Sequence, residues 1–247
     1  MKYLKLLAVV MLVGLASQTA FGRTEDSDAK LAAGLQNKIY EAKVFNHGQV
    51  TTTLKDGVAT LTGRVDNLGA KLDAEKAARK AKGVTQVVNN IQVRADDVTE
   101  KQILEKARHE ILTYYAYGIF DNINLAARGV KLIVSGQVTQ PFKKSDIGNF
   151  LARVRGVAEV ENDLEVLPLS TFDDRLRMRV ARAIYGDPFF VHYAVRSLPP
   201  IHIIVKNGNV TLEGAVATKL DSAKAEMAAR TNGLSFSVVN NLRVDRS

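Results

Sequence analysis

The sequence repeats one pattern of residues three times, and this repetition limits what the chain can fold into more than any other feature. Each copy has a glycine-containing turn and strand, in segments 56–65, 128–138 and 207–216, and a later strand that carries an asparagine. The strand glycines are Gly63, Gly136 and Gly214, and the asparagines are Asn89, Asn162 and Asn240. Both sets recur at intervals of 73 and 78 residues. Because this period is too long for a solenoid repeat, we expect each copy to be a small domain.

Each copy reads in the order helix, strand, strand, helix, strand. The first helices are predicted to begin near Asp28, Thr99 and Thr171, and Thr99 followed by Gln102 fits a capping box. We therefore predict an α+β fold of three tandem αββαβ units, each a small three-stranded mixed sheet covered by two helices on one face. The units are residues 28–95, 96–168 and 169–247.

The repeated glycines and asparagines have a structural and a binding interpretation. The hairpins are predicted to turn at Asp56-Gly57, Arg128-Gly129 and Asn207-Gly208, and Asp-Gly and Asn-Gly suit a type I′ turn better than Arg-Gly does. The strand glycines mark a bulge or a close approach of two backbones, or alternatively a ligand contact. The asparagines either satisfy backbone groups at a strand edge or bind a partner. We favour the structural interpretation for both sets.

The first 22 residues have the three parts of an export signal. Lys2 and Lys5 give a positive start, residues 6–16 are apolar, and residues 17–22 are small or polar, with a cleavage site between Gly22 and Arg23. The apolar run is too short for a membrane-spanning helix, which takes about 20 residues, so an uncleaved anchor is the less favoured alternative. We expect a protein of the periplasm, or otherwise exported, that is peripheral to the membrane.

The composition excludes several kinds of function. The 247 residues include no cysteine, which excludes disulfides and thiolate catalysis, and the four histidines lack a short ligand spacing. The sequence contains no G-x-S-x-G, G-x-x-x-x-G-K-[ST], G-x-G-x-x-G or H-E-x-x-H motif. We therefore predict no enzyme activity, no metal and no cofactor. The net charge of +8 permits an anionic partner, and export favours a membrane surface over nucleic acid.

The repeated pattern resembles a known domain family. G-V-x-L-x-G-x-V in the hairpin, the later G-V-x-x-V-x-N-x-L and the order α-β-β-α-β are similar to the BON domain, named for bacterial osmotically inducible periplasmic and nodulation-associated proteins. The resemblance covers about residues 28–247; the second copy departs at Arg128, and the third has Gly233-Leu234 in place of Gly-Val and one extra residue before Asn240. It implies an exported protein whose domains bind phospholipid or envelope partners, with no catalytic residues to transfer.

Two groups of side chains are candidates for contact with a partner. Aromatic residues gather after the first helix of the second and third units, at Tyr114, Tyr115, Tyr117 and Phe120 and at Phe189, Phe190 and Tyr193. They either enter a membrane interface or close the core of their unit. Arginines gather on the first helix of the third unit, at Arg175, Arg177, Arg179 and Arg182. All except Arg177 share one face, which either binds anionic headgroups or is simply solvated.

Two hypotheses of function follow. The first is a non-enzymatic envelope protein that binds anionic phospholipid surfaces through the third unit, in envelope or osmotic stress protection. The second is a periplasmic chaperone or protein-interaction scaffold that holds periplasmic client proteins with exposed aromatics. Headgroup attraction weakens as ionic strength rises, whereas apolar client binding does not, so salt separates the two. The sequence does not give the oligomeric state.

Overall fold

The computed structural model describes residues 25–232 and 234–245, so the expected cleavage site at Gly22 and Arg23 lies outside the described residues. The first unit contains α1 (Glu25–Glu41), the 3-10 turn η1 (Val44–Asn46), β1 (Gly48–Lys55), β2 (Val58–Val65), α2 (Leu68–Arg79) and β3 (Gln86–Val93). The second contains α3 (Glu100–Thr113), β4 (Asn122–Arg128), β5 (Lys131–Val138), α4 (Pro141–Ala152) and β6 (Glu159–Val166). The third contains α5 (Thr171–Tyr185), η2 (Pro188–Phe190), α6 (Val191–Ala194), β7 (Ile201–Lys206), β8 (Asn209–Val216), α7 (Lys219–Asn232), β9 (Ser237–Asn240) and β10 (Arg243–Val244).

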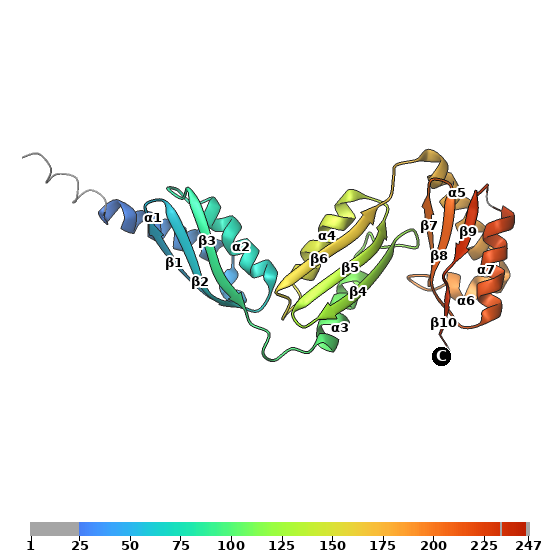
Figure 1. The fold of residues 1–247 in the computed structure, drawn as a ribbon, viewed down its shortest axis with the longest axis horizontal. Helices are drawn as coiled ribbons and strands as arrows, with labels where there is room; N and C mark the ends of the chain where they lie inside the picture. Colours follow the sequence, from blue (N-terminus) through green and yellow to red (C-terminus); the bar gives the residue numbers. More distant parts are fainter. Residues whose placement is uncertain (1–24, 233, 246–247) are drawn as a thin grey trace, which may run out of the picture.

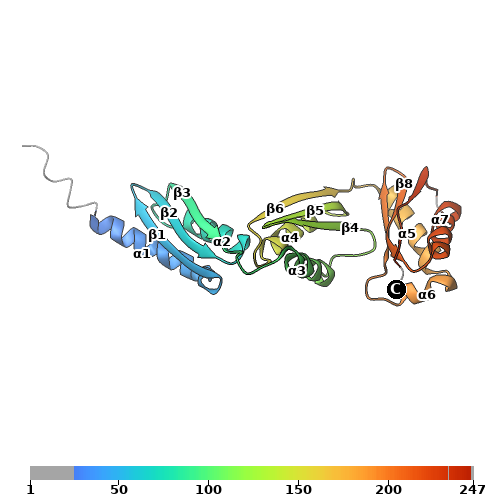
Figure 2. The ribbon, with the colours of Figure 1, turned by 60° about the horizontal axis from the view of Figure 1, so that its bottom comes forward.

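The three units have the predicted α+β fold and lie in a row (Figures 1 and 2). In each unit the first two strands form an antiparallel hairpin, and the last strand pairs in parallel with the second strand of that hairpin. The sheets are therefore mixed, as predicted. In the third unit the last strand is divided into β9 and β10, which both pair with β8.

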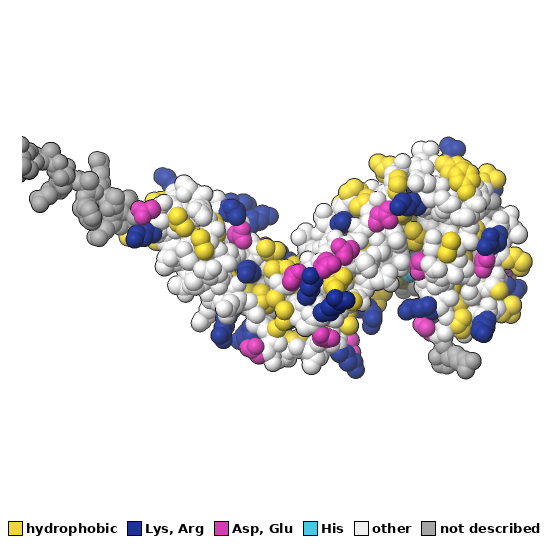
Figure 3. All heavy atoms as spheres, in the orientation of Figure 1, with side chains coloured by type: hydrophobic (Ala, Val, Ile, Leu, Met, Phe, Trp, Pro, Cys, Tyr) yellow, Lys and Arg dark blue, Asp and Glu magenta, His cyan; other side chains and the backbone are white. Residues whose placement is uncertain are grey.

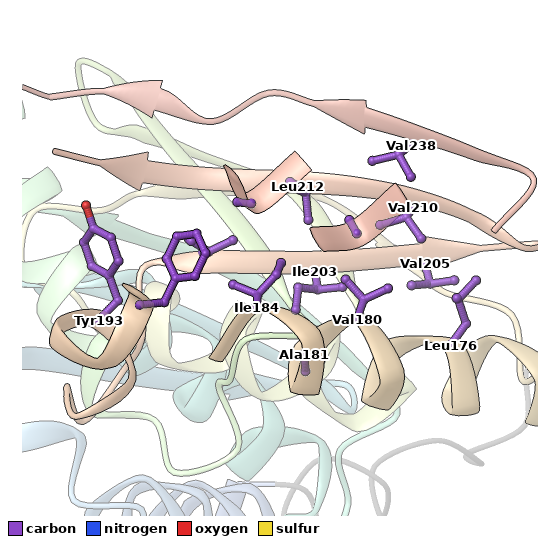
Figure 4. Packing of buried hydrophobic residues seen from close by; sticks show 14 of the residues in the cluster. Leu176, Val180, Ala181, Ile184, Tyr193, Ile203, Val205, Val210, Leu212 and Val238 are labelled. Carbon is purple, nitrogen blue, oxygen red and sulfur yellow. The ribbon is translucent and has the colours of Figure 1, made fainter. Parts of the chain in front are cut away.

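The helices of each unit cover one face of its sheet and bury the core there. In the third unit Leu176, Val180 and Ile184 of α5 pack in one cluster with β7 and β8 residues such as Ile203 and Leu212 (Figure 4). All five side chains are at most 2% exposed, because the helix repeat of 3.6 residues aligns one apolar stripe with the inward side of the strands.

The strand glycines lie where two backbones approach closely. Gly63, Gly136 and Gly214 have φ angles of 130°, 120° and 111°. A Cβ at these positions would lie 2.1, 2.1 and 2.0 Å from the carbonyl oxygens of Gln49, Asn122 and Pro200. Only glycine fits both the φ angle and the space, which accounts for the repeat without a ligand.

The hairpin of the second unit turns one residue later than predicted. Arg128 pairs with Lys131 in the sheet, so the turn residues are Gly129 and Val130, with Gly129 at φ 59°. The prediction of an Arg128-Gly129 turn was wrong because arginine avoids the positive φ that the first position requires, whereas glycine accepts it. The other two turns fall at Asp56-Gly57 and Asn207-Gly208, where all four residues have φ between 50° and 79°.

The repeated asparagines join the last strand of each unit to its second long helix. Nδ2 of Asn89, Asn162 and Asn240 donates to the carbonyl oxygens of Lys71 (3.1 Å), Lys144 (2.9 Å) and Ser222 (3.1 Å). The Oδ1 atom of each accepts from the backbone N–H two residues later. One amide side chain thus satisfies both a helix carbonyl and a strand N–H, which accounts for asparagine at this position.

Replacing Asn162 with alanine is expected to destabilise the second unit by about 1–3 kcal/mol, because the half-buried Lys144 carbonyl and Leu164 N–H lose their side-chain partner. Urea unfolding followed by circular dichroism measures this change. Asn124→Ala, at an exposed position of β4, is the control and is expected to change the stability little. Equal effects of the two substitutions would contradict the role given to Asn162.

Neighbouring units are joined by direct contacts. Between the first and second units, the N–H of Leu68 donates to the Val157 carbonyl (2.8 Å) and the N–H of Gly156 donates to the Asp66 carbonyl (2.7 Å). Between the second and third units, the N–H of Ile203 donates to the carbonyl oxygen of Ile119 (2.6 Å). The units therefore pack against one another instead of hanging as separate beads.

Candidate functional site

Helix α5 is fixed to its sheet by polar contacts at its first turns. Ser170 caps the helix by accepting from the N–H of Asp173 (3.2 Å). Asp173 is fully buried, and its carboxylate accepts from the N–H groups of Asn207 and Gly208 in the β7–β8 turn, both at 2.8 Å. Arg177 is 5% exposed and donates to the Val205 carbonyl (2.7 Å) and to Asp174. These contacts hold one face of α5 on the sheet and turn the opposite face outward.

The outward face of α5 carries three exposed arginines. They are Arg175, Arg179 and Arg182, at the spacing i, i+4 and i+7 of one helix face. None of the three forms an ion pair with a carboxylate among residues 25–232 and 234–245. The face therefore presents positive charge that the chain itself does not neutralise.

An apolar groove lies along the same face. It has a volume of about 540 Å³ and is lined by the arginines and by Phe172, Met178 and Leu234. These three apolar side chains are 42%, 51% and 63% exposed. Phe236, which is 77% exposed, stacks on Phe172 with ring centroids 6.0 Å apart. Figure 3 shows hydrophobic side chains gathered at the top of the third unit, the end at which α5 and β9 begin.

Four of the predicted site residues lie inside the protein, so they are removed from the candidate site. Phe190, Tyr193 and Tyr114 are 0%, 2% and 6% exposed, and Arg177 is held against β7. Tyr193 donates to Asp221 (2.9 Å), and Tyr114 donates to Asp146 (2.7 Å). Burial raises the pKa of both phenols. For these aromatics the alternative interpretation holds, since a small unit has few other large side chains to fill its core.

The remaining predicted aromatics lie in three different environments. Phe189 is half-buried against the core of the third unit, with Nζ of Lys224 4.2 Å from its ring centroid. Phe120 belongs to the second unit but packs against the core of the third, and Tyr117 stacks on His202. Tyr115 is 88% exposed. The structure does not bring these four residues together with the arginines of α5.

The second unit has the same groove with different chemistry. Buried Ile103, Ala107 and Ile111 of α3 correspond to Leu176, Val180 and Ile184 of α5 at a spacing of 73 residues. At that spacing Gln102, Glu105 and Lys106 stand where α5 has Arg175, Met178 and Arg179. The groove of the second unit is about 220 Å³, and Arg155 on its rim pairs with Asp97.

The first unit also has a groove of about 530 Å³ between its helices, and its charges are mixed. Lys38, Lys76 and Lys80 line it together with Glu41 and Asp73, and Lys38 pairs with Glu41 at 2.6 Å. Of the three grooves, the one on α5 combines apolar side chains with arginines that lack ion-pair partners in the described part of the chain.

Sequence reasoning missed the apolar half of this site. Phe172, Met178, Leu234 and Phe236 are scattered in sequence, and they meet only because the α7–β9 loop folds beside the start of α5. One signal was present: Leu234 stands where the second unit has Val157, and Val157 is fully buried whereas Leu234 is exposed. Val157 is covered by the first unit, which donates a hydrogen bond to its carbonyl.

The BON domain model matches residues 27–95, 102–168 and 173–246. The chain belongs to the BON domain family. The three matched regions correspond to the three structural units, which confirms the resemblance seen in the sequence. Across the described residues of this BON protein, no helix is both long and apolar enough to cross a membrane.

Relatives of this BON protein were found among curated proteins and solved structures. It is 32% identical over 76 residues to a protein of Anaplasma centrale described as an uncharacterized protein in the gshII 5′ region. That match covers 31% of this chain and spans about half the length (49%) of the relative.

Two solved structures are similar at low identity. CdsD, a structural protein of the type III secretion system of Chlamydia trachomatis, is 13% identical with a TM-score of 0.25, over 86% of this chain and 93% of that one. The PrgH periplasmic domain is 14% identical with a TM-score of 0.21, over 84% and 99%. At such TM-scores neither likeness supports an inference about this chain.

Proposed function

We propose that this protein is a non-enzymatic, exported envelope protein that binds anionic phospholipid surfaces through the outward face of α5. The observation that carries the proposal is the set of three exposed arginines without ion-pair partners in the described residues, beside an apolar groove. The family resemblance, which implies phospholipid or envelope partners, supports the same conclusion. A role in osmotic or envelope stress protection rests on that resemblance alone.

The charge of the α5 face suits an anionic surface. A basic side chain near an anionic bilayer contributes about 1 kcal/mol, so Arg175, Arg179 and Arg182 together contribute about 3 kcal/mol. This attraction acts within a Debye length and weakens in salt. An ion pair with a neighbouring carboxylate would have offset it, and none of the three arginines has one within the described residues.

The groove supplies the second requirement for stable binding to an interface. Surface-bound helices place apolar side chains at the boundary between headgroups and acyl chains while basic residues stay at the level of the headgroups. Phe172, Met178 and Leu234 are the exposed apolar side chains on this face, and Phe236 extends them beyond the helix. The inserting residues in this proposal are therefore these four, in place of the aromatics that follow α5.

Co-sedimentation with vesicles tests the proposal. The protein is expected to sediment with vesicles that contain an anionic phospholipid, to bind less as salt is raised, and to bind weakly to zwitterionic vesicles. Absence of binding to both kinds of vesicle would overturn the proposal. The chaperone or scaffold hypothesis would then lead, with the same groove as a contact for client proteins.

Removing apolar side chains from the groove separates insertion from charge attraction. Met178→Ser/Leu234→Ser is expected to weaken binding to anionic vesicles about tenfold at low and at high salt, since burial of apolar surface is not screened by ions. Leu72→Ser/Leu112→Ser, at positions of similar exposure in the other units, is the matched control and should bind as the unmodified protein does. Equal losses in the two variants would show that the groove has no special part in binding.

A further inference from the structure

His202 is a buried histidine at the junction of the second and third units. It lies on β7 and is 8% exposed, and its Nδ1 atom has no hydrogen-bond partner in the described part of the chain. The strand register places it where the first unit has Thr51 and the second has Asn124, both of which are exposed. This histidine is buried because the neighbouring unit covers it.

A loop of the second unit forms the cover. The Tyr117 ring stacks on the His202 imidazole, with centroids 5.5 Å apart and planes at 22°. Ile119 and Phe120 pack against the core of the third unit, and the Ile119 carbonyl accepts from the N–H of Ile203. Lys206 of β7 pairs with Glu165 of β6 at 2.5 Å. These contacts form one joint, and separation of the two units would expose His202 to water.

A proton on His202 acts against this joint. The imidazolium form has two N–H donors, and Nδ1 faces no acceptor in the closed arrangement. A buried charge with an unsatisfied donor is costly, whereas the same group in water is not. Protonation is therefore disfavoured while the units are docked and becomes favourable once they separate.

The charged and titratable groups around His202 only partly offset this effect. Asp121 lies in the covering loop, but its buried carboxylate already accepts from Lys143 of α4 at 2.7 Å. Glu213 of β8 lies opposite His202 in the sheet and favours its charged form. The pKa of Tyr117 is raised to about 12 by burial, so this phenol stays neutral. Burial is the largest effect on His202 and lowers its pKa, against the opposing carbonyl groups of Asp121 and Gly118.

We propose that the joint between the second and third units is a pH-sensitive hinge, which opens in acid when His202 takes up a proton. Because the pKa of His202 is lowered when the units are docked, the separated state binds more protons. Docking is therefore fully favoured above the pKa of an exposed histidine, about 6.5, and weakens as the pH falls below it. Opening frees the third unit, with its α5 face, to reorient relative to the other two.

Energy transfer between two dyes measures the opening directly. The chain has no cysteine, so Lys101→Cys on α3 and Met227→Cys on α7 place one label on each side of the joint. Transfer is expected to change between about pH 7.5 and about pH 5, with the circular dichroism of the units unchanged. In the same labelled background, His202→Phe keeps a ring against Tyr117 and is expected to abolish the transition.

Three controls keep the test decisive. His192→Phe changes an exposed histidine of the same unit and is expected to leave the transition intact. Should His202→Phe fail to fold, His202→Gln removes the titration with a smaller side chain. Lys206→Glu removes the ion pair to Glu165 and is expected to shift the opening to higher pH. The proposal is overturned if the unmodified protein shows no transition, if the His202 variants keep it, or if it coincides with loss of secondary structure.

Discussion

The double substitution Arg175→Glu/Arg179→Glu is expected to reduce binding to anionic vesicles at least 30-fold. Each lost arginine removes about 1 kcal/mol of attraction, so two account for about 30-fold, and the new carboxylates add repulsion. The effect should be largest at low ionic strength and shrink as salt screens the surface. Co-sedimentation over a range of vesicle concentrations measures it.

The chain supplies its own matched control. Lys101→Glu/Lys106→Glu makes the same change in net charge on α3, the equivalent helix of the second unit, where both side chains are exposed. This variant is expected to bind to within about threefold of the unmodified protein, because only the general attraction of the chain changes. Equal losses in the two variants would mean that net charge, and not the α5 face, drives binding.

Gly136→Ala is expected to unfold the second unit or to destabilise it by more than about 3 kcal/mol. The added Cβ would lie 2.1 Å from the Asn122 carbonyl oxygen, and the backbone has φ 120°, which other residues rarely adopt. Neither the clash nor the strain is relieved without separating β4 from β5. Urea unfolding followed by circular dichroism measures the loss.

Gly34→Ala is the control for this substitution. Gly34 lies exposed within α1, and a Cβ there meets no heavy atom within 4 Å. Because alanine favours a helix more than glycine does, this variant is expected to gain up to about 1 kcal/mol. A mild effect of Gly136→Ala, similar in size to that of Gly34→Ala, would contradict the close approach of the two strands.

The fold was predictable from the sequence because the repeat carries its own structural reasons. Gly63, Gly136 and Gly214 recur where two backbones meet, and each repeated asparagine recurs where a strand is tied to a helix. Such positions depend on local geometry that every copy shares. The turn of the second unit was misplaced by one residue because its glycine precedes the position that the other copies use.

The site was only half predictable. The arginine stripe depends on helix spacing alone and was visible in the sequence, apart from the burial of Arg177. The aromatic segments after α3 and α5 give no sign of which rings turn inward, since Phe189 and Phe190 are adjacent and only Phe190 is fully buried. Leu234 is exposed because no unit packs on it as the first unit packs on Val157, and such contacts depend on tertiary arrangement.

An environment-sensitive dye at Leu234→Cys tests the central claim most directly, since the protein has no other cysteine. The same dye at Glu105→Cys, in the groove of the second unit, is the reference. With anionic vesicles, the label at position 234 is expected to show a blue-shifted emission and quenching by a quencher within the acyl chains, whereas the label at 105 should show neither. The account of the α5 face would be contradicted if both labels responded alike, or if the protein bound the vesicles with the label at position 234 still in water.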